Sequence, residues 1–251
     1  MTTDPRARSF DTAADQYATT RPSYPPALLD AVEELAGRRL AGARVADVGA
    51  GTGIASALLR GRGAEVVAVE PGEAMARRCG EVVPVVRGDG NALPLAGACF
   101  DLVTYAQSWQ WTDPARSVPE ALRVLRPGGA LAIWWNTTAF DVPWIRAQHA
   151  RIARAVRGTK PASATRPDDE DAVRLAGLSG LRVVRRLLRW SRVVPLDTHL
   201  ANIGSRSAFL VLGEEPRRAF FAAERGLLSA AFPDGLIEET DVVDLLVALR
   251  P

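Results

Sequence analysis

The 251-residue sequence is poor in the residues that bind metals or form disulfides, with only two cysteines and two histidines. Cys79 and Cys99 form no close pair of the kind that ligates a metal. We therefore expect two reduced cysteines packed against apolar neighbours, no structural disulfide and no metal site.

Long apolar runs are also missing. No stretch reaches 18 apolar residues, and residues 1–15 lack the apolar centre of a signal peptide. The sequence therefore predicts a soluble, cytoplasmic protein without a membrane partner.

Lysine is nearly absent, because Lys160 is the only one and arginine supplies the other positive charges. The 31 basic and 29 acidic residues leave a net charge of +2, which is too balanced to indicate nucleic-acid binding by itself. Arginine stays protonated, so these residues can bind carboxylates but cannot act as general bases. A small molecule is the expected partner, and nothing in the sequence indicates an oligomeric state.

What the sequence does contain is a regular alternation of short apolar runs and helical patterns, which is typical of βαβ units with a parallel sheet. The expected strands are residues 43–49, 65–70, 81–89, 99–106, 129–135, 181–194 and 236–250. The expected helices between the first five strands are residues 54–61, 71–79 and 114–125, the last stopped by Arg-Pro-Gly-Gly at 126–129. The predicted fold class is α/β, a doubly wound, mostly parallel, seven-stranded Rossmann-like sheet.

Helical segments are expected on both sides of this sheet. Residues 11–37 should form two amino-terminal helices, and residues 166–180 a helix with an acidic first turn. Residues 196–234 are mostly helical in pattern and too long for a simple connection between the last two strands, which should pair with each other. We expect them to form a helical cap, inserted before the last strand, over the carboxyl edge of the sheet.

The first expected strand runs into a glycine-rich turn and then a helix, which lets the backbone approach a ligand closely. The turn reads Asp47-Val48-Gly49-Ala50-Gly51-Thr52-Gly53, and Ile54 stands where the dinucleotide fingerprint G-x-G-x-x-G would need glycine. Seventeen residues after Gly53, the second strand ends in Glu70, which could accept hydrogen bonds from both hydroxyls of a ribose. Together these features predict an adenosine cofactor.

Five segments in order resemble the motifs of the class I S-adenosylmethionine-dependent methyltransferases, in particular the small-molecule branch that includes trans-aconitate methyltransferase-like proteins. They are residues 45–53 for the first motif, 66–75 for the second, 88–103 for the third and fourth, and 122–133 for the fifth. Residues 10–25 resemble the amino-terminal cofactor lid of that family. The resemblance implies S-adenosylmethionine as cofactor and S-adenosylhomocysteine as product. It also implies one methyltransferase domain over residues 1–251, with a core at 10–135 and a substrate cap at 138–170 and 196–234.

The resemblance assigns roles to individual residues. Asp47 would order the turn and help to seat the methionine end, Glu70 would hold the ribose, and Asp89 would accept a hydrogen bond from the adenine amino group. The remaining residues expected at the cofactor are Gly49, Ala50, Gly51, Gly53, Pro71, Met75, Gly90 and Gln107, with Tyr17, Arg21 and Tyr24 closing over it.

No general base is evident at the position where the family would carry one. Family members often have a histidine or an aromatic residue near position 110, where this sequence has Gln110. The candidates for a catalytic role are Trp109, Gln110 and His149. Trp109 could border the sulfonium or anchor the packing of the cap, and lone histidines such as His149 and His199 are more often structural.

Arginines crowd two segments of the carboxyl-terminal half. Five of them lie in residues 182–192, and Arg151, Arg154 and Arg157 recur at every third position. A solvated strand face and a solvated helix face are the favoured interpretations, although the second group could attract an acidic substrate.

The predicted function is the in-line transfer of a methyl group to oxygen, nitrogen or carbon of a small molecule. Alignment of the reactants can supply roughly 7–11 kcal/mol of barrier reduction without a base. Two alternatives remain at this point. The protein could bind the cofactor as a sensor or for a non-methylating reaction, or it could methylate nucleic acid, for which only the mild basicity speaks.

Overall fold

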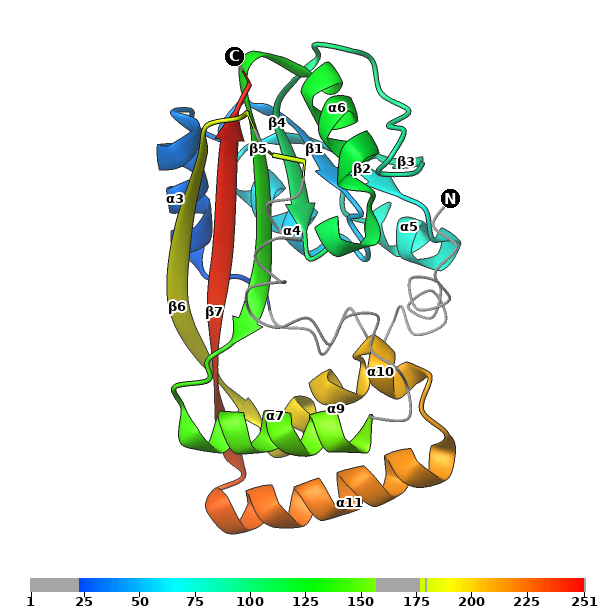
Figure 1. The fold of residues 1–251 in the computed structure, drawn as a ribbon, viewed down its shortest axis with the longest axis vertical. Helices are drawn as coiled ribbons and strands as arrows, with labels where there is room; N and C mark the ends of the chain where they lie inside the picture. Colours follow the sequence, from blue (N-terminus) through cyan, green and yellow to red (C-terminus); the bar gives the residue numbers. More distant parts are fainter. Residues whose placement is uncertain (1–22, 157–176, 179, 251) are drawn as a thin grey trace.

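A computed structural model describes residues 23–156, 177–178 and 180–250 of the chain, which fold around one seven-stranded sheet (Figure 1). The strand order is β3-β2-β1-β4-β5-β7-β6. The strands are β1 (Arg44–Val48), β2 (Glu65–Glu70), β3 (Val85–Arg87), β4 (Phe100–Ala106), β5 (Leu125–Thr138), β6 (Val183–Pro195) and β7 (Leu236–Leu249). β1 to β5 are parallel, and β7 runs antiparallel to both β5 and β6. The predicted doubly wound α/β fold is confirmed.

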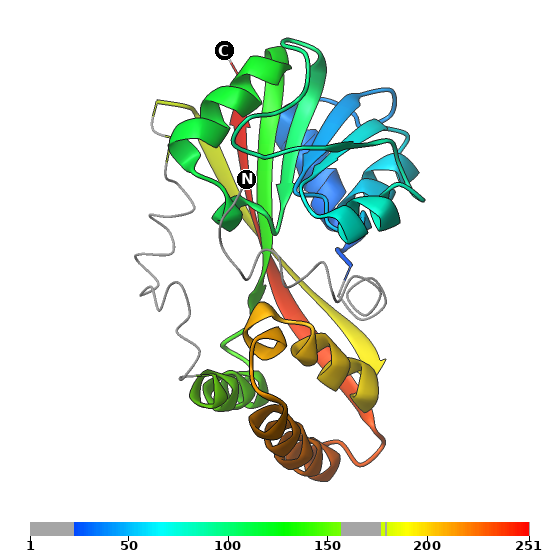
Figure 2. The same ribbon diagram turned by 90° about the vertical axis from the view of Figure 1, so that its right-hand side faces the viewer.

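Helices cover both faces of the sheet, as Figure 2 shows from the side. The helices are α3 (Pro26–Ala36), α4 (Ile54–Gly61), α5 (Glu73–Cys79), α6 (Pro114–Val124), α7 (Pro143–Ala155), α9 (Leu196–Gly204), α10 (Ser207–Leu210) and α11 (Glu214–Ala231), with a short 3-10 turn η2 at Trp109–Trp111. Leu28 of α3 and Leu59 of α4 belong to the apolar core on one face. Val118 of α6 belongs to the core on the other face.

The amino end of α6 illustrates how the local sequence specifies an element. Asp113 precedes the helix with extended backbone angles, and its carboxylate accepts a hydrogen bond from the Ala115 amide at 3.0 Å. Pro114 occupies the first helical position, where its missing N–H is not needed.

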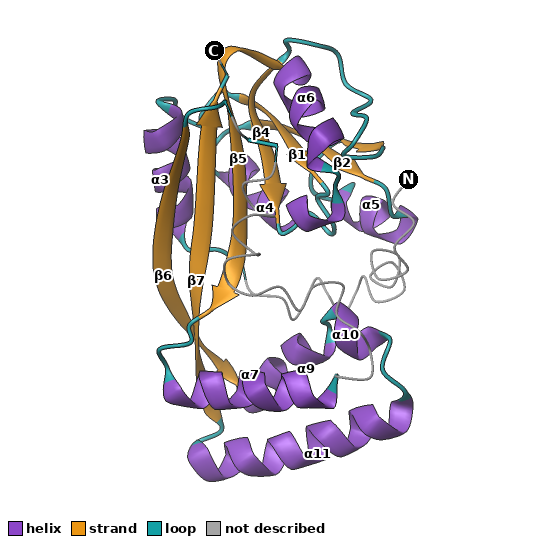
Figure 3. Cartoon of the chain, in the orientation of Figure 1, coloured by secondary structure: helices purple, strands orange, loops and turns teal. Residues whose placement is uncertain are grey.

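β5 and β7 continue well past the carboxyl end of the neighbouring strand β4. The last residue of β4, Ala106, is level with Trp134 of β5, whereas β5 stays paired with β7 as far as Thr138 opposite Asp241. This four-residue extension is about 13 Å long at the usual rise of a strand. It leads to a separate helical layer, formed by α7 after β5 and by α9, α10 and α11 between β6 and β7 (Figure 3).

We call this helical layer, together with the strand ends that it packs on, the cap. Its apolar clusters are small. One contains Leu200, Leu228 and Ile237, and another contains Ile203 and Phe209. The helical cap predicted between the last two strands is therefore present. Within the residues that the structure describes, no helix is long and apolar enough to cross a bilayer.

Several predicted boundaries need correction. β3 is shorter than the predicted strand over 81–89, because the amides of Val82 and Val83 still donate to the Cys79 carbonyl and Pro84 has no N–H. β5 is longer than predicted at both ends. It begins at Leu125 because the expected turn at 126–129 lies inside the strand at a shift of register, and it continues to Thr138 because β7 pairs with it.

The remaining helix predictions are met only in part. Of the two helices expected in residues 11–37, α3 lies in the described part of the chain. Most of the predicted helix over 166–180 lies outside it, but that helix does not reach its predicted end, since Gly177 and Gly180 adopt left-handed backbone conformations in turns.

Candidate functional site

The glycine-rich turn after β1 packs so closely that side chains are excluded at two of its positions. Gly49, Gly51 and Gly53 have φ values of 67°, 58° and 88°, all in the left-handed region. A Cβ atom on Gly49 would lie 2.5 Å from Cβ of Ser108, and one on Gly53 would lie 3.0 Å from Sγ of Cys79. The turn therefore presents bare backbone at the carboxyl edge of the sheet.

Glu70, the last residue of β2, is hydrogen-bonded to this turn. One carboxylate oxygen accepts from the Gly51 amide and the other from the Gly72 amide, both at 2.8 Å. The residue is only 8% exposed. Each carboxylate oxygen can accept more than one hydrogen bond, so Glu70 is held in place and can still accept from ligand hydroxyls.

Asp47 is buried completely beneath the turn. Its carboxylate accepts hydrogen bonds from Ser56 Oγ at 2.6 Å and from Thr104 Oγ1 at 2.8 Å. Burial raises the pKa of Asp47, and the two hydroxyl donors oppose that rise. Asp47 thus ties β1 to α4 and β4, as expected of a residue that orders the turn. Its part in seating the methionine end stays a prediction.

The ends of β2 and β3 bring the next group of predicted residues to the same edge. Asp89 accepts hydrogen bonds from the backbone and side-chain amides of Asn91, at 2.9 and 3.0 Å. Met75 is buried in α5, and the Pro71 carbonyl accepts from Arg87 Nε at 3.1 Å. The Gly90 carbonyl accepts from the Tyr105 hydroxyl at 3.3 Å, and a Cβ there would lie 3.1 Å from Cγ2 of Thr112.

Gln107 follows β4 with a φ of 57°, a left-handed conformation that is uncommon for a residue with a side chain. Its amide donates to the Trp134 carbonyl at 2.9 Å, and its Nε2 donates to the Asn136 carbonyl at 3.4 Å. Next to it, Ser108 Oγ donates to the Val48 carbonyl at 2.6 Å. Backbone strain of this kind is typical of functional sites, where the surroundings hold an unfavourable conformation.

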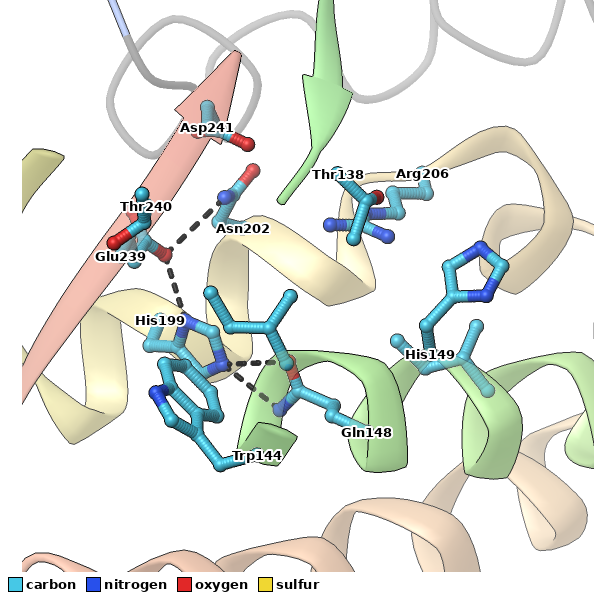
Figure 4. A pocket seen from close by; sticks show the side chains of 12 residues that line it. Thr138, Trp144, Gln148, His149, His199, Asn202, Arg206, Glu239, Thr240 and Asp241 are labelled. Atoms are coloured by element: carbon cyan, nitrogen blue, oxygen red, sulfur yellow. Dashed lines mark hydrogen bonds and ion pairs between the residues drawn. The ribbon is translucent and has the colours of Figure 1, made fainter. Parts of the chain in front are cut away.

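A pocket, which we call the cap pocket, lies where the cap meets the extended ends of β5 and β7 (Figure 4). It encloses about 420 Å³ of empty space, part of it open to solvent. The lining residues are Thr138, Trp144, Ile145, Gln148, His149, Ile152, His199, Asn202, Arg206, Glu239, Thr240 and Asp241. They come from α7, α9 and its continuation, and the strands β5 and β7.

A hydrogen-bonded chain crosses the floor of the cap pocket, with His199 at its centre (Figure 4). His199 Nδ1 lies 2.7 Å from Oε1 of Glu239, and its Nε2 lies 2.9 Å from the Nε2 and 3.1 Å from the Oε1 of Gln148. Burial raises the pKa of Glu239, but the hydrogen bond to His199 and the charge of Arg192 outweigh it and hold this pKa below its ordinary value.

The hydrogen bonds through His199 and Gln148 continue to an ion pair inside the cap. Gln148 Nε2 donates to Oε1 of Glu224 at 3.0 Å, and Arg151 binds both oxygens of that carboxylate at 2.7 Å. Glu224 is 1% exposed. The interpretation of Arg151 as part of a solvated helix face was therefore wrong.

The interpretation of the β6 arginines as a solvated face holds for Arg186 and Arg189, which pair with the exposed acids Glu34 and Asp141, but not for two others. Arg185 binds Asp244, which is buried, through two hydrogen bonds of 2.8 Å, and Arg192 pairs with buried Glu239 at 2.6 Å. Isolated buried carboxylates are costly, and these arginines supply the compensating charge. The signal available in the sequence was weak, because acid and base are separated by 47 to 73 residues.

Asp241 differs from these paired acids. It lines the cap pocket, and its carboxylate has no hydrogen bond or ion pair with any residue in the described part of the chain. Burial and the negative charge of Glu239 raise its pKa to about 6, although Arg206, Arg192 and His199 act in the opposite direction. No motif in the sequence marks Asp241 as a functional residue.

Comparison with known proteins gives the fold a family. Residues 46–133 match the model of a methyltransferase domain. A methyltransferase of uncharacterised activity from Mycobacterium tuberculosis is 42% identical over 141 residues, which are 55% of this chain and 56% of that protein. A solved structure from Anaeromyxobacter dehalogenans, provisionally assigned as a type II methyltransferase, is 28% identical with a TM-score of 0.64 and covers 92% of this chain and 96% of its own.

The chain contains a methyltransferase domain, and its sheet has the fold of the class I methyltransferases. It spans about half the length of the curated relatives that it matches. A phosphoethanolamine N-methyltransferase from Haemonchus contortus, solved with S-adenosyl-L-methionine, has the same fold at 15% identity and a TM-score of 0.54, over 98% of this chain and 60% of that one. Class I methyltransferases use S-adenosylmethionine, as the sequence predicted.

The carboxyl edge of the sheet fits that cofactor. No side chain caps the amino end of α4, so its first N–H groups point at the edge with the positive end of the helix dipole. Thr52 Oγ1 is buried beside them and has no hydrogen-bond partner among the described residues. A ligand carboxylate would satisfy both features, and Glu70 remains able to hold ribose hydroxyls.

The three predicted catalytic candidates lie in different surroundings. Trp109 is 1% exposed and packs edge-to-face on Tyr105, with ring centroids 4.9 Å apart, in the apolar core between the sheet and α6 rather than in the cap. Gln110 donates to the Gln107 carbonyl at 2.7 Å and accepts from Trp135 Nε1 at 2.9 Å. Neither the indole of Trp109 nor the amide of Gln110 can act as a general base. His149 lies far along the chain, in the lining of the cap pocket.

The predicted lid is described only at its end. Tyr17 and Arg21 lie outside the described residues. Tyr24 packs edge-to-face on Trp134 with ring centroids 5.9 Å apart, near the end of β4.

Proposed function

We propose that this protein transfers a methyl group from S-adenosylmethionine to a small-molecule acceptor held in the cap pocket. One observation carries the proposal. The buried Glu70 carboxylate is fixed by hydrogen bonds from the backbone amides of Gly51 and Gly72, at the carboxyl ends of the strands, where open α/β sheets bind their ligands.

Different residues would bind different parts of the cofactor. Glu70 would accept from the ribose hydroxyls, Asp89 from the adenine amino group, and the amino end of α4 would receive the methionine carboxylate. Pro71 and Met75 would flank the adenine. The bound cofactor supplies an activated methyl group on a positively charged sulfur.

The cap would supply the acceptor site. The chain would thus be divided into a cofactor-binding core at 10–135 and a substrate cap at 138–170 and 196–234. The register supports this, because Thr138 and Asp241 in the pocket lie only about 13 Å along the strands from the level of the end of β4. The task left to the protein is to align an acceptor lone pair with the methyl carbon in line with the breaking carbon–sulfur bond. Such alignment can lower a barrier by roughly 7–11 kcal/mol.

Calorimetry with S-adenosylmethionine, S-adenosylhomocysteine and NADH tests the cofactor. We expect both forms of the first cofactor to bind and NADH not to bind. Glu70→Gln should weaken cofactor binding at least about tenfold. A glutamine side chain has one acceptor oxygen, so it cannot accept from both backbone amides and from the ribose hydroxyls as two carboxylate oxygens can. Glu65→Gln, at the exposed start of the same strand, is the matched control. Binding of NADH alone would overturn the proposal.

Incubation with cofactor labelled on the methyl group tests the transfer. We expect label to move to a member of a panel of small amines, alcohols and carboxylic acids. Tight cofactor binding with no label transferred to any member of the panel would instead favour a protein that senses the cofactor.

A further inference from the structure

The cap pocket contains one acidic side chain, Asp241, that forms no direct ion pair with any described residue. Three other acids of this region, Glu224, Glu239 and Asp244, are each buried and each bound by an arginine at 2.6 to 2.8 Å. Asp241 has no such contact with any described residue, although it lies two positions from Glu239 on the same strand. A group left unpaired in an otherwise fully matched network is available to a ligand.

The surroundings of Asp241 favour a positively charged ligand group. Glu239 adds a second negative charge to the same wall, and the side chain is largely shielded from water. Arg206 also lines the pocket, but it has further interactions within the protein. A ligand cation at Asp241 would neutralise a carboxylate that lies in a poorly solvated place.

The opposite side of the pocket is apolar enough to hold the body of such a ligand. Ile145 and Ile152 of α7 are both buried and belong to the lining. Trp144 is held by edge-to-face contacts with His199 and Phe232, at centroid distances of 5.7 and 5.2 Å. Pockets that combine an apolar wall with a few fixed polar groups are typical of small-molecule sites.

We infer, on the basis of the proposed function, that the acceptor carries an amine in its ammonium form and that Asp241 binds this group and determines specificity. The hydrogen-bonded chain through His199 and Gln148 is a positioning element, because it fixes the strand β7 and the helix α7 on the two sides of the pocket.

Three probes of one shape test this inference. Benzylamine, benzyl alcohol and benzoate differ mainly in the charge of one group, and their binding can be followed in the indole N–H resonance of Trp144, assigned with Trp144→Phe. We expect the protonated amine to bind at least about tenfold more tightly than benzoate. Asp241→Asn should remove that advantage and leave the binding of benzyl alcohol unchanged. Asp141→Asn, an acid outside the pocket that pairs with Arg189, is the matched control.

Two outcomes would overturn the inference. One is that benzoate binds most tightly, or that benzylamine does not bind at millimolar concentrations. The other is that Asp241→Asn binds benzylamine as the unchanged protein does. Because these titrations need no cofactor, a failure here is separate from a failure to bind S-adenosylmethionine, which would remove the proposed function itself.

A pH titration of the unchanged protein gives a second readout that needs no variant. Benzylamine binding should weaken as the pH falls through about 6, since protonation removes the charge of Asp241. Affinity independent of pH between 5 and 8 would count against the inference. The other charged or titratable groups that face Asp241 or line the pocket are Glu239, Arg192, His199, Arg206 and His149.

Discussion

The cofactor edge of the sheet and the cap both bury acidic side chains, but they satisfy them in different ways. At the edge, Asp47 is bound by two hydroxyls and Glu70 by two backbone amides. In the cap, Glu224 and Glu239 are bound by arginines from distant parts of the chain. The acids of the edge fix the backbone of the glycine turn, whereas those of the cap join helices and strands whose apolar clusters are small.

This difference implies that the two regions fail in different ways. Removing a neutral partner at the edge alters a turn, while removing a charged partner in the cap leaves an uncompensated charge in a small core. The following four changes test that contrast.

Arg151→Met should have the largest effect. It leaves Glu224, 1% exposed, without its guanidinium, and breaking a buried pair in this way costs about 3–5 kcal/mol. Urea unfolding and hydrogen exchange of the α7 and α11 amides would measure the loss. Arg218→Met on α11 removes an ion pair of which both members are about three-quarters exposed, and it should change little. Equal effects of the two changes would contradict the contrast.

Gly49→Ala should come next, at roughly 2–4 kcal/mol, because the new Cβ would meet Ser108 in a backbone conformation that alanine disfavours. Cofactor binding should be lost with it, as judged by calorimetry. Gly37→Ala has a similar φ of 61° but no neighbour within 4 Å, so it isolates the conformational part, about 1 kcal/mol. If both variants unfold at the same urea concentration, close packing at Gly49 is not the cause.

Asp241→Asn should stabilise the protein. The folded pKa of about 6 lies above the ordinary value of 3.8, so between these values the native state holds a proton that the unfolded chain releases. The contribution of Asp241 to stability therefore falls as the pH rises from about 4 to 6. At pH 7 to 8 the variant should be more stable by about 1–3 kcal/mol, and below pH 4 the gain should vanish. A variant less stable than the unchanged protein at pH 8 would show that Asp241 has a structural partner.

Asp113→Ala should have the smallest effect, about 1 kcal/mol, since it removes the side-chain cap of α6 without disturbing either buried network. Asp113→Asn keeps an acceptor oxygen and should retain most of the stability. Thermal unfolding of both variants would measure the difference. A loss as large as that of Arg151→Met would mean that the core is no more tolerant than the cap.

The same contrast explains how much could be predicted from the sequence. The residues of the carboxyl edge lie close together in the sequence, and the spacing from Gly49 to Gly53 and on to Glu70 was enough to predict them. β2 begins and ends where predicted. The seven-stranded sheet and the last strand were predicted correctly from apolar patterns.

The cap pocket could not be predicted in this way. Gln148, His199 and Glu239 are brought together across 40 to 51 residues at a time, and each looks like an ordinary surface residue in its own segment. Charge pairing over such distances leaves no periodic signal, so the pairing of Arg151, Arg185 and Arg192 with buried acids was not predicted, and Asp241 was missed.

The length of the β5–β7 ladder determines the distance between the carboxyl edge and the cap pocket. Adding two residues to each strand would carry the cap pocket about 7 Å farther from the glycine turn and leave every side chain on its original face. Adding one residue to each would place the cap pocket on the opposite face of the sheet relative to the glycine turn. Proteins that share this edge could therefore accommodate longer or shorter acceptors in steps of two residues, without altering the part that binds the cofactor.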